Sequence, residues 1–223
     1  MELRHEWKHE ITQSDLLAIR SRLRAIASPD EHAGPNGCYS VRSLYFDTPD
    51  DRALREKLDG VNLREKFRLR CYNGSSKPVF LEKKIKLNGL CGKRSVELSA
   101  DETRALLDGD VEWMRGGDTL LQELYYKLAS ELLRPRTIVE YTREPFVYSP
   151  GNVRVTIDTD IRTGILNADF LDSRSLTVPV AGSPVLLEVK YDGFLPDIIR
   201  DAVQLTGRRS SAFSKYAACR IYG

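Results

Sequence analysis

Four cationic side chains recur at every second residue within 62–72, NLREKFRLRCY. Charged and apolar residues alternate along this stretch, which is typical of a β-strand with one charged and one apolar face. The charged face carries Arg64, Lys66, Arg68 and Arg70, and neighbours on one face of a strand lie about 7 Å apart. Cations at this spacing repel one another unless an anion lies opposite them. The stretch therefore predicts either a solvated sheet face or a binding site for a polyanion.

The elements that must position these cations are mostly strands. Alternation predicts strands at 3–11, 38–47, 62–72, 79–87, 91–98, 135–148, 153–162 and 184–191. Helical periodicity predicts helices at 12–27, 50–58, 100–107, 119–133 and 196–205, followed by a turn at 207–209 and a closing segment at 211–221. No repeat or long linker divides the chain. This order predicts one α+β domain, residues 1–223, built on an antiparallel sheet.

Lysine and arginine recur on one face of most of these strands, and the opposite faces are apolar enough to need cover from amphipathic helices. We therefore expect an antiparallel β-barrel with helices packed on the outside and basic side chains inside. Such an interior is costly unless it is wet and holds an anion. A chain of phosphates fits, because guanidinium and ammonium groups form charge-assisted hydrogen bonds with phosphate oxygens. A carboxylate among them, such as Glu188, suits a divalent ion that bridges phosphates.

The overall composition argues against several other classes of protein. The 223 residues carry a formal net charge of only +2, whereas a diffuse nucleic-acid binder usually has a larger basic surplus and aromatic platforms that stack bases. No apolar run approaches the ~20 residues of a membrane span, and residues 1–10 lack a signal-peptide core. We expect a cytoplasmic protein without direct membrane insertion. Its four cysteines form no C-x-x-C pair, so reduced thiols are expected.

Seven segments, in order along the chain, resemble the polyphosphate polymerase (VTC) domain family, a branch of the CYTH or triphosphate-tunnel superfamily. They are VRSLYFDTP, NLREKFRLR, LEKKIKLNGLCGKRS, LRPRTIVEYTREPF, NVRVTID, LLEVKY and AFSKYAACR. The likeness runs from about residue 4 to residue 223. It implies a tunnel of antiparallel strands that binds a nucleoside triphosphate or a polyphosphate chain, as one domain of this type over residues 1–223.

Carried over position by position, the resemblance implies a set of phosphate ligands and one metal ligand. The catalytic cations would be Arg68, Arg70, Lys84, Arg143 and Arg154, with Lys8, Lys93, Lys190, Ser214 and Lys215 as further phosphate ligands. Glu188 would hold Mg²⁺ or Mn²⁺. Alternation favours Lys84 over Lys83, whereas the strand neighbours of Arg143 mark no polar face. The sequence leaves open whether Arg64, Lys66 and Lys86 are ligands or solvated rim residues.

The resemblance implies transfer of the γ-phosphoryl of ATP to a growing polyphosphate chain. No activated Ser, Cys or His is apparent, and phosphoryl transfer relies mainly on positioning and charge neutralisation. The superfamily's hydrolases typically carry E-x-E-x-K in the first strand, where residues 6–10 here read EWKHE. The absence of paired glutamates favours transfer over hydrolysis. A triphosphatase of the same fold and a non-catalytic polyphosphate-binding module are the alternatives, and a separate membrane partner that exports the product is left open.

Overall fold

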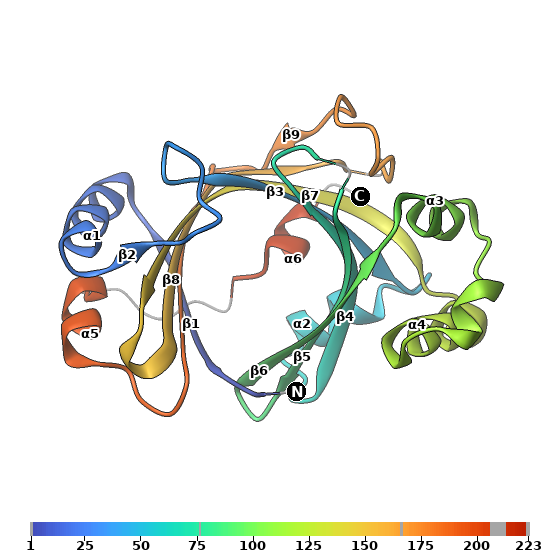
Figure 1. Ribbon diagram of the computed structural model, residues 1–223, viewed down its shortest axis with the longest axis horizontal. Coiled ribbons are helices and arrows are strands. Elements are labelled where there is room, and N and C mark those ends of the chain that lie inside the picture. The colour runs from blue at the N-terminus through green and yellow to red at the C-terminus, as the bar shows by residue number, and fades with distance from the viewer. Residues whose placement is uncertain (1, 76, 166, 206–212, 222–223) are drawn as a thin grey trace.

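The computed structural model describes residues 2–75, 77–165, 167–205 and 213–221 (Figure 1). These residues form one ten-stranded sheet with the order β1-β10-β8-β7-β3-β4-β5-β6, in which β2 pairs with β7 and β9 with β8. The strands are β1 (His5–Ile11), β2 (Ser28–Pro29), β3 (Tyr39–Asp47), β4 (Arg64–Tyr72), β5 (Val79–Leu87), β6 (Leu90–Leu98), β7 (Arg134–Tyr148), β8 (Val153–Thr163), β9 (Val178–Pro179) and β10 (Val185–Tyr191). Every strand predicted from alternation is present, with only small shifts at the ends. The turn predicted at 207–209 lies outside the described residues.

The sheet is antiparallel and curls until its two edges meet. Arg4, just before β1, and Cys91, in β6, exchange two backbone hydrogen bonds of 2.9 Å each. This bridge joins the edges at one point. The concave side of the curled sheet (Figure 1) encloses a hollow, which is lined by residues of β1, β4, β5, β7 and β10. The predicted antiparallel tunnel architecture is thus confirmed, as a barrel that is only partly closed.

Local sequence signals explain where several elements begin and turn. Helix α1 (Gln13–Ile26) starts at a capping box, in which the side chains of Thr12 and Asp15 each accept a hydrogen bond from the other's backbone N–H. Asn88 and Gly89 both have positive φ, 51° and 81°, as a tight two-residue hairpin turn requires. This turn sets the register in which β6 continues along β5.

Two groups of helices cover the convex side of the sheet (Figure 1). Helices α1 and α5 (Asp197–Val203) pack on β8 and β10 through a core that includes Ile19 and Leu187. Helices α3 (Ala100–Asp108) and α4 (Thr119–Ser130), with the 3₁₀ helix η1 (Glu112–Gly116), pack on β3, β4 and β5 through a core that includes Leu69 and Leu124. The apolar strand faces are buried here, so the charged faces point into the hollow.

Helix α6 (Lys215–Cys219) departs from the expectation that the helices lie outside. It sits on the concave side of the sheet (Figure 1). Tyr216 and Cys219 are buried there against Tyr45, Val139 and Tyr141. The inner surface is therefore not basic throughout, because an apolar patch beneath α6 fills part of the hollow. The remaining short helices are α2 (Arg52–Leu58) and the 3₁₀ helix η2 (Pro150–Asn152).

Two further expectations concern membranes and thiols. Within the described part of the chain, no helix combines the length and apolar character needed to span a bilayer. Cys38, Cys71, Cys91 and Cys219 are free thiols in the structure. Burial raises the pKa of the Cys219 thiol to about 12, which keeps it protonated and unreactive.

Candidate functional site

The hollow of the sheet contains a cavity of about 380 Å³, which falls within the ~300–1,000 Å³ range of ligand sites. The predicted site residues that line it are Lys8, Arg68, Arg70, Lys84, Arg143, Glu188, Lys190, Ser214 and Lys215. They come from β1, β4, β5, β7, β10 and the start of α6. Among the described residues, the carboxylates in the lining are Glu6 and Glu188. Cations from many segments therefore converge on one space.

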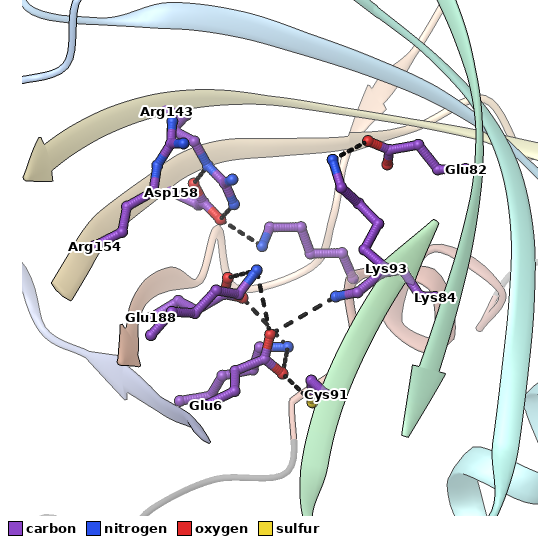
Figure 2. A network of polar contacts seen from close by, with 12 residues as sticks. Glu6, Glu82, Lys84, Cys91, Lys93, Arg143, Arg154, Asp158 and Glu188 are labelled. Carbon is purple, nitrogen blue, oxygen red and sulfur yellow. Dashed lines mark hydrogen bonds and ion pairs between the residues drawn. The ribbon is translucent and has the colours of Figure 1, made fainter. Parts of the chain in front are cut away.

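Glu82 organises the first group of cations, behind the cavity wall. Arg68 donates to Glu82 Oε2 from Nε at 2.8 Å and from Nη2 at 2.5 Å. Lys93 Nζ lies 2.8 Å from Oε1 on the other side (Figure 2), and Arg70 Nη1 lies 3.6 Å from Oε2. Burial alone would raise the pKa of Glu82, but these three cations hold it far below its ordinary value. The ionised carboxylate fixes the guanidinium group of Arg68 by hydrogen bonds and attracts that of Arg70.

Asp158 organises the second group. Its carboxylate accepts a bidentate pair from Arg143, 2.7 Å from Nε and 2.8 Å from Nη2, and lies 2.5 Å from Lys215 Nζ (Figure 2). Arg143 shares the inner face of β7 with Tyr141, which belongs to the apolar patch beneath α6. This explains why strand parity did not single out Arg143. The inner face of β7 itself changes from apolar to polar along its length.

The third group consists of three lysines around the carboxylates of Glu6 and Glu188. Lys8 Nζ lies 2.7 Å from Glu6 Oε2 and 3.3 Å from Glu188 Oε2. Lys190 Nζ lies 3.0 Å from Glu188 Oε1 and 3.5 Å from Glu6 Oε1, and Lys84 Nζ lies 3.7 Å from Glu6 Oε1 (Figure 2). Burial would raise the pKa of Glu188, but Lys190, Lys8 and Lys84 hold it well below its ordinary value. Both glutamates are thus anionic at neutral pH.

Glu6 was not identified as a site residue from the sequence. Its position in the fold changes the argument that the absence of paired glutamates favours transfer over hydrolysis. Because Lys8 lines the cavity, the E-x-K half of the hydrolase pattern falls on Glu6 and Lys8, and Arg4 takes the place of the first glutamate. The side chain of Arg4 bonds Asp192 at 2.6 Å instead. A pair of glutamates is present after all, since the fold places Glu6 beside Glu188. The signal was available, because Glu6 and Lys8 share a strand face.

Glu6 and Glu188 fit a divalent cation together with an anionic ligand. Glu6 Oε1 is buried without a hydrogen-bond partner, and Mg²⁺ is commonly held by one or two carboxylates plus substrate phosphates. Over the described residues, no cluster of three or more His, Cys, Asp or Glu side chains offers a complete protein cage. Three lysines crowd the same carboxylates. We therefore expect a metal to bind there only when phosphate draws those lysines away.

Two predicted ligands do not line the cavity. Lys93 is bound to Glu82, and Arg154 bonds Asp30 at 2.8 Å and the hydroxyl of Tyr39 at 3.0 Å. Arg154 is nevertheless the cross-strand partner of the lining residue Lys190. Ser214, which does line the cavity, also caps α6, where its hydroxyl accepts from the backbone N–H of Ala217.

Two tyrosines add hydroxyl groups that the sequence analysis did not assign to the site. Arg68 Nη1 donates to the hydroxyl of Tyr45 at 2.7 Å, and Arg70 Nη2 donates to that of Tyr141 at 3.0 Å. Both tyrosines line the cavity. Burial raises the pKa of Tyr45, but Arg68, Arg70 and Lys84 outweigh it and lower the pKa to about 7. Tyr45 thus belongs both to the buried apolar patch beneath α6 and to the lining of the site.

Solved structures that share the fold of this chain include three proteins of low sequence identity. The Hippeastrum protein HpAC1, a proposed adenylyl cyclase with a dominant triphosphatase activity, has 12% identity and a TM-score of 0.58 over 98% of this chain and 95% of that one. A proposed adenylate cyclase from Bacillus halodurans has 15% identity and a TM-score of 0.52 over 85% of this chain and 80% of that one. PH1012 from Pyrococcus horikoshii has 14% identity and a TM-score of 0.50 over 95% and 96%.

These likenesses show the fold, which is that of the triphosphate tunnel. A search among curated protein sequences found no match. The family model for the VTC domain matches residues 3–221, nearly the whole length. The chain belongs to the VTC domain family.

Proposed function

We propose that the protein is an ATP-dependent polyphosphate polymerase, which transfers the γ-phosphoryl of ATP to a growing polyphosphate chain. The observation that supports this most is the convergence of lysines and arginines from seven segments on one cavity, in which Glu6 and Glu188 are the carboxylates among the described lining residues. An excess of fixed cations in a partly enclosed space matches a ligand with several negative charges in a row. Membership of the VTC domain family agrees with a polyphosphate-related role.

In this proposal the protein acts by position and charge. Arg68, Arg70 and Arg143 clamp the donor and acceptor phosphates in line, because planar guanidinium groups hold phosphate oxygens at fixed angles. The carboxylates behind them already fix two of these side chains, so little ordering is needed when the ligand binds. No nucleophilic side chain is required, since the acceptor is itself a phosphate oxygen.

The remaining cations of the site neutralise charge around the transferring group. Lys8, Lys84, Lys190 and Lys215 line the cavity beside their carboxylates and would turn to phosphate oxygens when the ligand binds. Lys93 and Arg154 would contact phosphate only after leaving Glu82 and Asp30. Mg²⁺ or Mn²⁺, held by Glu188 and Glu6, would offset charge on the transferring phosphoryl group.

The direct test is to incubate the purified protein with ATP and Mg²⁺ or Mn²⁺ and to analyse the products on a gel that resolves polyphosphate by length. We expect chains that lengthen with time and ADP formed in step with them. Free phosphate without chains would replace the proposal with a triphosphatase. Binding of polyphosphate without ATP consumption would replace it with a non-catalytic binding module.

A triphosphatase is the second candidate, and the pair Glu6 and Glu188 favours it. Two carboxylates beside one another can position both a metal and a water molecule on a terminal phosphate. The same gel separates the two candidates when tripolyphosphate replaces ATP as the substrate. Rapid release of phosphate from tripolyphosphate favours the hydrolase, whereas a polymerase leaves most of it intact.

A further inference from the structure

The cations that line the cavity divide into two classes by their partners. Four of them, Lys57, Arg64, Lys66 and Lys86, have no carboxylate within ion-pair distance anywhere in the described residues. Every other lysine and arginine in the lining has one. The first four are also the residues that the resemblance did not assign to the site.

These unpaired cations are neighbours on one side of the cavity. Arg64 and Lys66 are the first two inward-facing cations of β4, and Lys86 of β5 is the cross-strand partner of Arg64. Lys57 comes from the last turn of α2, which packs against β4. All four are half-buried, whereas Arg68 and Arg70 further along β4 are buried. The inner face of β4 thus runs from paired, buried cations to unpaired, accessible ones.

The arrangement leaves positive charge without compensation. Burial, together with Lys84, Lys57 and Arg64, lowers the pKa of Lys66 to about 8 against the opposing effect of Tyr45. The ammonium group of Lys66 lies 5.0 Å from the centre of the Tyr216 ring, and Arg64 donates to the backbone carbonyl of Val61. Neither contact supplies a negative charge. A polyanion passing along this side would relieve the mutual repulsion.

We propose that Lys57, Arg64, Lys66 and Lys86 form a second subsite, which holds the polyphosphate chain beyond the phosphates that react. The ligand class rests on the proposed function. The paired cations hold the phosphates at the centre, and the unpaired ones hold the rest of the chain as it leaves through the α2–β4 side. The subsite makes affinity depend on chain length, because only a long chain covers both sets of cations.

The test compares two double variants that each remove two positive charges. One is Arg64→Gln with Lys86→Gln, and the matched control is Arg104→Gln with Arg174→Gln, whose side chains are 63% and 91% exposed outside the cavity. Binding of tripolyphosphate and of long-chain polyphosphate is measured for both by calorimetry, without ATP or metal and over a range of salt concentrations.

We expect the Arg64/Lys86 variant to bind long chains roughly tenfold more weakly and to bind tripolyphosphate as the wild type does. For long chains, the slope of log affinity against log salt should become shallower by about two, since two fewer counterions are released. The Arg104/Arg174 variant should match the wild type for both ligands. Equal losses for both ligands would overturn the proposal, and so would no loss for either, which would make these cations a solvated rim.

This experiment separates the subsite from the proposed reaction. A length-dependent loss of affinity in a protein that makes no chains from ATP would support the subsite and contradict the polymerase. Suppose instead that the wild type makes chains from ATP, while the Arg64/Lys86 variant binds tripolyphosphate and long-chain polyphosphate with equally changed affinity. That result would support the polymerase and contradict the subsite.

Discussion

Lys83 and Lys84 are adjacent in β5 but lie on opposite faces of the sheet, and their surroundings differ. Lys83 points outward, where it lies 2.6 Å from Glu65, forms an ion pair with Glu123 and lies 5.6 Å from the centre of the Phe67 ring. Lys84 points inward, where its only described carboxylate partner is Glu6, 3.7 Å away. Glu6 favours the charged form of Lys84, but burial and the lysines at 8 and 190 outweigh it and lower the pKa to about 8.

The difference teaches what a structural cation and a ligand-binding cation look like in one fold. On the outer face, two carboxylates and an aromatic ring satisfy Lys83, so its charge supports the packing of β4, β5 and α4. On the inner face, the charge of Lys84 is a net cost to the folded protein without ligand. A bound anionic ligand would stabilise this charge. Substitutions on the inner face should therefore weaken ligand binding, whereas substitutions on the outer face should lower stability.

The largest contrast is expected between two glutamates. Glu188→Gln, on the inner face, should lower turnover about a hundredfold or more, because the metal loses its proposed ligand. The fold should persist, since Lys8 and Lys190 keep Glu6 as a counterion. Without metal, the variant should bind tripolyphosphate at least as tightly as the wild type, because one negative charge has left the cavity. Steady-state kinetics, thermal unfolding and calorimetry measure the three effects.

The matched outer-face variant is Glu123→Gln. This substitution removes the carboxylate that forms ion pairs with Lys83 and Arg94. It should therefore cost about 1 kcal/mol of unfolding free energy, with turnover unchanged. A Glu188→Gln protein that loses activity only in proportion to lost folded protein would contradict the division between the two faces.

A smaller contrast is expected between the lysines themselves. Lys84→Gln should weaken tripolyphosphate binding roughly tenfold, as expected when a charged hydrogen bond to phosphate is lost, and should leave the unfolding free energy equal or higher. Lys83→Gln should leave binding intact and cost about 1–2 kcal/mol of stability, because it leaves Glu65 and Glu123 without their shared partner. Denaturant unfolding measures the stability of both variants, and calorimetry measures their affinity for tripolyphosphate. Equal effects of the two substitutions would show that the faces do not differ.

The smallest expected effect is a pH dependence confined to the inner face. Lys66 and Lys84 have pKa values of about 8, below the ordinary value of 10.5, so both are charged below pH 8 and neutral well above it. Binding needs the charged form, so affinity for tripolyphosphate should fall several-fold as pH rises from 7 to 9.5, because Lys84 loses its charge. Affinity for long-chain polyphosphate should fall further, because Lys66 loses its charge as well. Near pH 8 to 9 the protein should take up protons on binding, which calorimetry in buffers of different ionisation enthalpy detects. Affinity independent of pH over this range would contradict the low pKa values.

Much of the fold could be predicted from the sequence because strand alternation is a local signal. The charged and apolar faces of β4 and β5 follow from the residue types at every second position, and the hairpin turn at Asn88 and Gly89 links β5 to β6. The inward position of helix α6 had no such signal. Its placement depends on the apolar patch of Tyr45, Val139 and Tyr141, which forms only when β3 and β7 pair.

Some features of the candidate site could likewise be predicted from the sequence, and others could not. Face alternation placed Arg68, Arg70 and Lys84 on the inner surface, and the family resemblance added Arg143, whose strand neighbours are apolar. Both missed that carboxylates such as Glu82 and Asp158 hold these cations from behind. Such pairings join residues that lie far apart or on different strands, so no local pattern reveals them. The roles of all these residues stay predictions until they are tested.

The most direct measurement is a crystal structure of the protein with tripolyphosphate and Mn²⁺. The account predicts phosphate oxygens in contact with Arg68, Arg70 and Arg143 inside the cavity, and Mn²⁺, identified by its anomalous signal, on Glu188 and Glu6. The same account predicts that the outer ion pairs of Lys83 are unchanged. A ligand bound only to the outer surface, with the inner arginines still bonded to Glu82 and Asp158 alone, would contradict the claim that the inner face of this sheet is a polyanion site.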